Sequence, residues 1–352
     1  PPPKVTADDT AVLLYTSGTT GKPKGVCQTH GNLSSDVDAS IELARLKEEH
    51  HFLGLIPLFH SFGLMAMMLV PARLGASVFY LPRFQPTQIV DAIRDQKVSV
   101  TMMIASMYSA LLRIKSAGPE DFKTLKYVIA GGEAFPDAVF HAVKDRFGFE
   151  VLQGYGMSEA SPVVSLNVPW DNRVGTVGRA IPGVEVKAFD DNDKEVPAGE
   201  IGELWIKGPN IMKGYYKKPE ETAAVLTQGG WYKSGDMGTV DADGFIKITG
   251  RKKEMIIVGG ENVYPREIES VLEQHPAVAE SAVVGQKDES RGEVVVAFVI
   301  LKEGAAATEL ELRDFCRDKI AGYKVPRRVV IAQELPRGPT GKILKRKLVE
   351  LL

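Results

Sequence analysis

Hydroxyl side chains, glycines and lysines are concentrated in one stretch near the beginning of the chain, between residues 15 and 25. Glycines let a backbone turn tightly and bring its N–H groups close to an anion, while hydroxyls add donors and lysines add positive charge. A predicted strand at 12–15 precedes the stretch and a predicted helix at 32–46 follows it, a setting that favours phosphate. We therefore predict a phosphate-binding loop made by Thr16, Ser17, Gly18, Thr19, Thr20, Gly21, Lys22 and Lys24.

Two other interpretations of this stretch are weaker. A Walker A loop needs Ser or Thr directly after its lysine, but Lys22 is followed by Pro23. This disfavours a kinase or ATPase of the P-loop class. Detection of ADP, rather than AMP, as the product of ATP would favour that class again. A flexible polar linker is disfavoured because so many features of a phosphate site coincide here.

The loop resembles the signature sequence of the adenylate-forming superfamily, which includes acyl-CoA synthetases, peptide-synthetase adenylation domains and firefly luciferase. Seven motifs follow one another in the order of that family across nearly the whole chain, and they resemble those of fatty acyl-CoA ligases most. The resemblance implies an acid–thiol ligase, an AMP-forming acyl-CoA synthetase that uses ATP, Mg²⁺ and coenzyme A.

Three further motifs are implied to form the nucleotide site. The first resembles the segment on which the family stacks adenine, namely Gly131, Gly132, Glu133 and Ala134; a glycine turn capped by Glu133 is the alternative. The second resembles the YGxTE motif, with Ser158 in place of threonine, and consists of Gln153, Gly154, Tyr155, Gly156, Met157, Ser158 and Glu159. In the third, Asp236 ends a W-x-x-[ST]-G-D motif and is implied to bind the ribose hydroxyls.

The resemblance assigns Mg²⁺ to Glu159 and Thr16, because Mg²⁺ prefers hard oxygen ligands and takes few protein carboxylates. A helix-capping or surface carboxylate is the alternative for Glu159, and an Asx turn is the alternative for Asp236.

The other motifs concern the acyl group and a moving domain. His60, in the segment 57–63, is implied to meet the substrate carboxylate at an apolar pocket, and a satisfied core histidine is the alternative. Arg251 is implied to contact ribose and phosphate, and Lys253 to be the hinge between domains. Gly259 and Gly260 are implied to line the path of the thiol, although Pro265 also suits a helix start there.

The last motif, P-x-T-G-K, ends in Lys342, which is implied to reach the α-phosphate and the carboxylate. The residues Lys345, Arg346 and Lys347 are expected on a basic surface helix. Catalysis is thus assigned to Lys342, Arg251, Glu159 and His60. These residues would neutralise charge so that a carboxylate can attack the α-phosphorus of ATP, after which a thiol attacks the acyl-adenylate.

Composition limits the class of protein and its partners. The chain has 352 residues and a formal net charge of -2, which gives no indication of a nucleic-acid partner. Two distant cysteines and the lack of an HExxH motif argue against a disulfide framework or a zinc site and fit a cytoplasmic location. The most apolar stretch, 62–74, is too short to span a bilayer, so a buried helix is expected there. A homodimer is left open.

Periodicity predicts an α/β fold with a large first domain and a small second one. Buried strands at 78–81, 98–104 and 127–130 alternate with helices, which predicts a mostly parallel sheet with helices on its faces. An antiparallel β unit is expected from about 175 to 250, with a hairpin at Asp243-Gly244. The domains are placed at 1–250 for the core and 251–352 for a mobile α+β domain.

Two questions stay open in the sequence. Family members carry a substantial further segment before the phosphate loop, so the chain is expected to be a fragment, a processed form or a shortened relative, and a catalytically idle nucleotide-binding module is an alternative. The side chains Phe59, Phe62, Met65 and Met157 favour an apolar acid, with a fatty acid ahead of an aryl acid. Free coenzyme A is favoured over a carrier protein as the acceptor because no carrier domain is present.

Overall fold

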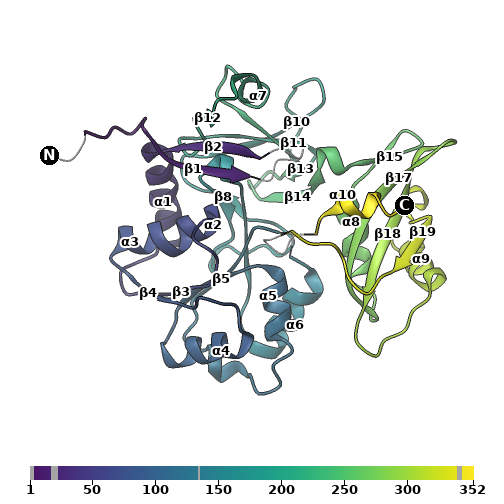
Figure 1. Cartoon of the computed structure of the whole chain (residues 1–352), viewed down its shortest axis with the longest axis horizontal. Helices are drawn as coiled ribbons and strands as arrows, with labels where there is room; N and C mark the ends of the chain where they lie inside the picture. The colour runs from purple at the N-terminus through teal and green to yellow at the C-terminus, as the bar shows by residue number, and fades with distance from the viewer. Residues whose placement is uncertain (1–3, 17–22, 134, 339–342) are drawn as a thin grey trace. The chain divides into compact units, whose positions relative to one another are not determined.

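The protein was analysed as a computed structural model, which describes residues 4–16, 23–133, 135–338 and 343–352 and divides into two compact units (Figure 1). The first unit comprises Pro1–Phe135, Val139–Ser234 and Gly238–Lys247. The second comprises Pro136–Ala138, Gly235–Met237 and Ile248–Leu352. No helix among the described residues is long and apolar enough to cross a membrane.

The central sheet of the first unit is mostly parallel, as predicted. Five neighbouring strands run parallel in the order β4 (Ser77–Tyr80), β3 (His51–Gly54), β5 (Val100–Met103), β6 (Tyr127–Ala130) and β7 (Leu152–Gly156). Two antiparallel strands extend it beyond β7, namely β8 (Val163–Leu166) and β9 (Arg179–Ala180). The sheet therefore presents the carboxyl ends of its parallel strands along one edge, where ligands bind in folds of this kind.

Successive residues of a strand point to opposite sides of the sheet. Apolar residues therefore face both sides of this sheet, and helices cover both faces. On β3, Leu53 packs in a core with helices α4 (Pro86–Asp95), α5 (Ala105–Leu111) and α6 (Asp137–Phe147). Its neighbour Phe52 packs in a second core with α1 (His30–Ala44) and the π-helix η1 (Met65–Leu69). The predicted α/β class is thereby confirmed (Figure 1).

Two of the predicted elements differ in the structure. The run at 78–81, expected to be a buried strand, forms the edge strand β4, whose Tyr80 is 49% exposed. The apolar stretch 62–74, expected to be one buried helix, is divided into α2 (Ser61–Leu64), η1 and α3 (Val70–Leu74). Its Met65, Ala66 and Met67 are buried, but Met68 is exposed because the helix lies on the sheet with one side only.

The predicted helix at 32–46 is confirmed as α1, but it does not follow the phosphate loop directly. The loop connects strand β1 (Thr10–Thr16) to an antiparallel partner, β2 (Lys24–Thr29), and α1 begins only after β2. The amino end of α1 is capped by its own residues, because Thr29 and Asn32 exchange hydrogen bonds in a capping box. Strand β2 also pairs with β12 (Gly214–Tyr215), which completes a three-stranded sheet.

The expected antiparallel β unit is present. Its four strands are neighbours in the order β10 (Glu185–Phe189), β11 (Gly202–Lys207), β13 (Tyr232–Val240) and β14 (Ile246–Arg251). The predicted hairpin at Asp243-Gly244 joins β13 to β14, and Gly244 has a φ of 83°, which favours glycine. Two short helical segments complete the first unit, η2 (Pro119–Phe122) and α7 (Pro219–Ala223).

The second unit is an α+β structure with a mixed sheet. The sheet has the order β16 (Glu261–Val263), β15 (Ile256–Val258), β18 (Gly292–Leu301) and β17 (Val278–Asp288), and β19 (Arg328–Ile331) pairs parallel with β18. One core joins the sheet to α8 (Pro265–Leu272) and α9 (Glu309–Arg317). A smaller core contains Leu348 of α10 (Lys345–Val349), so α10 packs through that side chain. Short 3₁₀ turns lie at η4 (Lys252–Glu254) and η5 (Gly322–Lys324).

Candidate active site

Two predicted nucleotide segments lie side by side because the strands before them are paired. Ala130, the last residue of β6, is the register partner of Gln153 on β7. A Cβ placed on Gly131 would lie 3.4 Å from the ring of Phe62 and 3.8 Å from the carbonyl oxygen of Gly154. Glu133 accepts a hydrogen bond from the backbone N–H of Ser106, on α5. The structure therefore brings the adenine segment, the 153–159 segment and the acyl motif together.

Ser158 connects three parts of the chain. Its hydroxyl lies 3.1 Å from that of Ser61 in the acyl motif, and its carbonyl oxygen accepts a 2.7 Å hydrogen bond from the side chain of Gln28 on β2. The substitution of serine for the usual threonine therefore keeps the polar contact. His60 begins α2, where its Nδ1 accepts a hydrogen bond from the N–H of Phe62. Phe59, beside it, is 79% exposed.

Gly156 is required by close packing. A Cβ there would lie 2.3 Å from the carbonyl oxygen of Pro162, a distance that side chains do not adopt. The same carbonyl accepts a 2.8 Å hydrogen bond from the N–H of Met157. The chain thus folds back on itself directly before the short 3₁₀ turn η3 (Ser158–Ala160), and this return places Glu159 in the turn.

Glu159 is half-buried and has a specific partner. Its Oε1 accepts a 3.0 Å hydrogen bond from the hydroxyl of Tyr215, and its backbone carbonyl accepts one from the N–H of Met212. Tyr215 is the last residue of β12, and Met212 lies just before that strand. The side chain of Glu159 does not cap a helix, because its carboxylate accepts a hydrogen bond from the phenol of Tyr215, which is distant in sequence.

Two buried tyrosines, Tyr215 and Tyr232, share a core with Ala160, the residue that follows Glu159. The hydroxyl of Tyr215 donates its proton to Glu159. Burial, and then the charge of Glu159, raise the pKa of Tyr215 above its usual value. Burial raises the pKa of Tyr232 as well. Both phenols are therefore protonated donors at neutral pH.

Lys24, at the end of the phosphate loop, lies against the same tyrosine. Its ammonium is 4.8 Å from the centroid of the Tyr215 ring, and it forms a 2.8 Å ion pair with Glu221 on α7. Glu221 also pairs with Lys218. The lysine therefore contacts one carboxylate and one aromatic ring, and that ring belongs to the residue whose hydroxyl bonds to Glu159.

A buried amide connects the segment after Glu159 to α1. The side chain of Asn210 donates to the carbonyl oxygens of Ala160 and Val163, at 2.9 Å and 2.8 Å. Asp36 of α1 accepts from the N–H of Val163 and from Asn210. Burial raises the pKa of Asp36 well above its usual value. This cluster fixes the backbone that follows Glu159.

Asp236 lies inside β13, so the Asx-turn alternative is wrong. Its side chain is almost fully buried, and its Oδ1 forms a 2.6 Å ion pair with Nε of Arg251. Arg251 is the last residue of β14, the strand that pairs with β13. The two residues implied to bind ribose and phosphate are thus in direct contact.

Lys345 is not a surface residue of a basic helix, contrary to the expectation. Its ammonium forms ion pairs with Glu269 on α8 at 2.8 Å and with Glu254 at 3.2 Å, and its side chain is 23% exposed. Burial alone would lower the pKa of Lys345, but the two carboxylates outweigh it and raise that pKa. Glu254 directly follows Lys253, the predicted hinge, which is exposed in η4. Arg346 and Lys347 are exposed, as expected.

Gly259 and Gly260 form the two-residue turn of the hairpin between β15 and β16. Their φ angles are 61° and 90°, and Val258 pairs with Glu261 across the turn. Two consecutive positive φ angles are typical of a tight hairpin, so these glycines have a structural reason to be there. Pro265 lies in the first turn of α8, as predicted.

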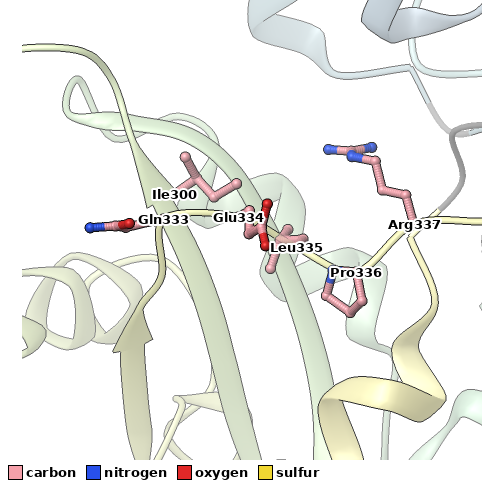
Figure 2. A pocket seen from close by; sticks show the side chains of 6 residues that line it. All are labelled: Ile300, Gln333, Glu334, Leu335, Pro336 and Arg337. Atoms are coloured by element: carbon pink, nitrogen blue, oxygen red, sulfur yellow. The ribbon is translucent and has the colours of Figure 1, made fainter.

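One open pocket lies elsewhere on the second unit. Figure 2 shows its lining, which comes from the end of β18 and from one extended segment, namely Ile300, Gln333, Glu334, Leu335, Pro336 and Arg337. The guanidinium of Arg337 forms an ion pair with Glu280. None of the site residues predicted from the sequence lines this pocket.

Several predicted residues lie outside the described part of the chain, namely Ser17, Gly18, Thr19, Thr20, Gly21, Lys22, Ala134 and Lys342. Among the described predictions, Thr16 ends β1 in register with Lys24. Gly132 has a φ of 85° directly after β6. Tyr155 lies on β7, half-buried.

The chemistry of Glu159 and Thr16 fits a magnesium ion. They offer one carboxylate and one hydroxyl, both hard oxygen donors, and Mg²⁺ is usually held by one or two carboxylates together with phosphate oxygens and water. Within 4–16, 23–133, 135–338 and 343–352, no three His, Cys, Asp or Glu side chains are grouped so that they could hold a metal by themselves. A shared site with a nucleotide is the arrangement that this donor set suits.

Sequence reasoning missed Tyr215, Tyr232 and Asn210. A buried tyrosine needs a partner for its hydroxyl, but Tyr215 stands between Lys213 and Lys217, so the sequence gives no indication that it is buried. Asn210 has no such indication, because its partners lie 174, 50 and 47 residues away in sequence.

Comparison with known proteins identifies relatives over the whole chain. A sequence profile described as AMP-binding enzyme matches residues 1–216, and one described as AMP-binding enzyme C-terminal domain matches residues 267–342. The chain is 41% identical to a long-chain-fatty-acid–CoA ligase of Bacillus subtilis, over 99% of the chain and 63% of that protein. It is 36% identical to an indoleacetate–CoA ligase of Aromatoleum aromaticum, over 99% of the chain and 69% of that protein.

A solved structure shares the fold as well. It is the o-succinylbenzoate coenzyme A synthetase of Bacillus subtilis in complex with ATP and magnesium ion, with a TM-score of 0.88 and 35% identity over 98% of the chain and 70% of that protein. The chain thus spans about two thirds of the length of the proteins it matches.

Proposed function

The chain belongs to the family of AMP-binding enzymes, and from this premise we propose that it activates a carboxylic acid with ATP and transfers the acyl group to the thiol of coenzyme A. The observation that carries the proposal is the meeting of three motifs around Ser158 and Gly131, with Tyr215 in contact with both the Glu159 carboxylate and the Lys24 ammonium. A purely structural packing of these segments would not need one tyrosine that contacts both an acid and a phosphate-loop lysine.

In the first step, an oxygen of the substrate carboxylate attacks the α-phosphorus of ATP, and the bond to pyrophosphate breaks. Both reactants are anions, so the protein must supply positive charge and fixed donors rather than a nucleophile. Lys24, Arg251 and Lys342 are the cations proposed for this task. Glu159 and Thr16 would hold Mg²⁺, which supplies further neutralisation of the phosphates when bound.

In the second step, the sulfur of coenzyme A attacks the acyl carbon, and AMP leaves. We propose that the chain divides functionally into a core at 1–250 and a mobile domain at 251–352, with its hinge at Lys253. An exposed, charged residue suits a hinge because it stays solvated through a large change of backbone angles. Gly259 and Gly260 are proposed to border the thiol, and His60 to meet the substrate carboxylate.

We propose a fatty acid as the substrate, ahead of an aryl acid. Exposed Phe59 and half-buried Phe62 and Met157 offer apolar surface near the site, whereas Met65 packs in the core of the unit. The relatives named above include a fatty-acid ligase and an aryl-acetate ligase, which keeps both classes in the test. A cytoplasmic location stays a prediction. A carrier protein stays the alternative to coenzyme A as the acceptor, and a homodimer stays open.

The proposal is tested by ATP–pyrophosphate exchange across a panel of fatty and aryl acids, followed by product analysis with coenzyme A. We expect exchange with at least one apolar acid, and AMP together with a thioester when coenzyme A is added. ADP as the product, or binding of ATP with no exchange for any acid, would overturn the proposal and favour a kinase-like or an idle nucleotide-binding protein.

A variant separates the two half-reactions. Lys342→Ala is expected to lower adenylate formation by about 10²–10³, the usual loss for one transition-state donor. Thioester formation from supplied acyl-adenylate should be spared, because the lysine is not needed after pyrophosphate has left. Equal losses in both assays would contradict this division of roles.

A further inference from the structure

We propose that Tyr215 is a positioning residue for the metal–nucleotide site, which it organises through two different parts of its side chain. The hydroxyl orients Glu159, and the ring supports Lys24. The inference rests on the proposed function, since it assigns the partner of the carboxylate that is proposed to hold the metal.

The hydroxyl fixes one oxygen of Glu159 and leaves its charge intact. Tyr215 donates a 3.0 Å hydrogen bond to Oε1, and it is the one hydrogen-bond partner of this carboxylate among the described residues. A neutral donor holds the direction of a carboxylate without cancelling its negative charge, which a cation then needs. Partners that orient a metal ligand in this way typically change metal affinity by about 10–100-fold when removed.

The ring of the same residue lies beneath the ammonium of Lys24. The distance of 4.8 Å from Nζ to the ring centroid is within the range of a cation–π contact. Lys24 thus contacts the ring of Tyr215 and also forms an ion pair with Glu221. One side chain thus fixes both a negative group for the metal and a positive group for the phosphates.

Several contacts besides those with Glu159 and Lys24 fix the position of Tyr215. Its backbone pairs with Val26 on β2, and its N–H donates a 2.9 Å hydrogen bond to the hydroxyl of Thr222. Its side chain is 8% exposed within a core that includes Tyr232. A phenylalanine would fill the same space, so the hydroxyl is explained by its hydrogen bond to Glu159 rather than by packing.

The test uses Tyr215→Phe, which removes the hydroxyl and keeps the ring. Binding of Mn²⁺ is followed by electron paramagnetic resonance in the presence of α,β-methylene-ATP, so that no turnover is required. We expect the dissociation constant for Mn²⁺ to rise about tenfold. The matched control is Tyr216→Phe, one residue further along and 44% exposed, which should leave Mn²⁺ binding within about twofold of the parent protein.

Two further variants check the assignment. Glu159→Gln combined with Tyr215→Phe should bind Mn²⁺ no more weakly than Glu159→Gln alone, because the hydroxyl acts through that carboxylate. Tyr215→Leu, which also removes the ring, should weaken binding of the nucleotide without metal relative to Tyr215→Phe. If Tyr215→Phe proves unstable, Tyr232→Phe removes the hydroxyl of the tyrosine that shares its core, and a rise of about twofold or more in the same constant is expected.

Unchanged Mn²⁺ affinity in a folded Tyr215→Phe protein would overturn the inference while leaving the proposed function in place. Fully additive losses in the double variant would also overturn it, since Tyr215 would then act independently of Glu159. A parent protein that binds no Mn²⁺ together with the nucleotide would overturn both the inference and the proposed function.

Discussion

The carboxylate of Glu159 in the first unit and that of Glu269 in the second are both shielded from solvent, but their partners differ in charge. Glu159 accepts from the neutral hydroxyl of Tyr215, whereas Glu269 accepts from the ammonium of Lys345 and from the N–H of Val283. A neutral partner leaves a net negative charge that can attract a cation, but a charged partner cancels it. The difference indicates that the first cluster is built to bind and the second to hold the unit together.

Glu159→Gln should have the largest effect and should leave stability almost unchanged. The amide still accepts the hydrogen bond of Tyr215 but has no charge for a metal, so we expect pyrophosphate exchange to fall on the order of 10²–10³. The melting temperature should stay within a few degrees. The control is Glu150→Gln, a surface carboxylate of the same unit that pairs with Lys144. A large drop in melting temperature for Glu159→Gln would break the comparison, because Glu159 would then be a structural residue.

Lys345→Met should show the opposite pattern. Removal of the ammonium leaves Glu269, which is 6% exposed, without its cation, so we expect a loss of about 3 kcal/mol in the free energy of unfolding. Urea denaturation measures the loss. Lys347→Met, two residues further on α10 and exposed, should change stability by less than about 0.5 kcal/mol. Equal stability of the two variants would show that the ion pairs of Lys345 contribute nothing.

Glu273→Gln should remove a pH dependence of stability. Burial raises the pKa of Glu273 to about 7 in the folded protein, although Arg266 opposes the rise. The group binds its proton more tightly when folded, so its contribution is complete below the ordinary pKa of 4.5 and is lost as pH rises through 7. Relative to the parent, the variant should gain about 2 kcal/mol of stability between pH 5 and pH 8. A constant difference between the two proteins across this range would contradict the burial argument.

Glu221→Gln should have the smallest effect, and it tests whether Glu221 competes with ATP for Lys24. The ion pair between Glu221 and Lys24 is partly exposed, and such pairs contribute little to stability. Its loss frees Lys24 for phosphate, so we expect ATP affinity to rise by up to about threefold, as measured by calorimetry at low salt. Weaker ATP binding would mean that Glu221 positions the lysine rather than competing for it.

The parallel sheet could be predicted because its strands are continuous apolar runs, such as 127–130, which must be buried on both faces. Strand β2 could not, because Lys24–Thr29 is a mixed polar segment whose partner β12 lies nearly two hundred residues further on. This intervening strand is why the expected helix does not follow the phosphate loop.

The same contrast holds for the site: some of its residues stand in short sequence motifs, and others have partners that are distant in sequence. The family motifs indicated Glu159 and Asp236, since those carboxylates stand in recognisable short patterns. The role of Lys345 could not be seen, because Glu254 and Glu269 reach it only through the fold, and a run of basic residues is usually solvated. Tyr215 was missed for the same reason: its two contacts come from Lys24 and Glu159, on two other segments.

The contact between Gly156 and Pro162 limits how the enzyme can be redesigned. A library that varies the proposed acyl site can diversify Met157, whose side chain is half-buried, but every replacement of Gly156 would push against a backbone carbonyl 2.3 Å away. Such replacements would displace the turn that carries Glu159 and would reduce turnover for all acids alike. Selection for a new acid should therefore retain glycine at 156 while the neighbouring position changes.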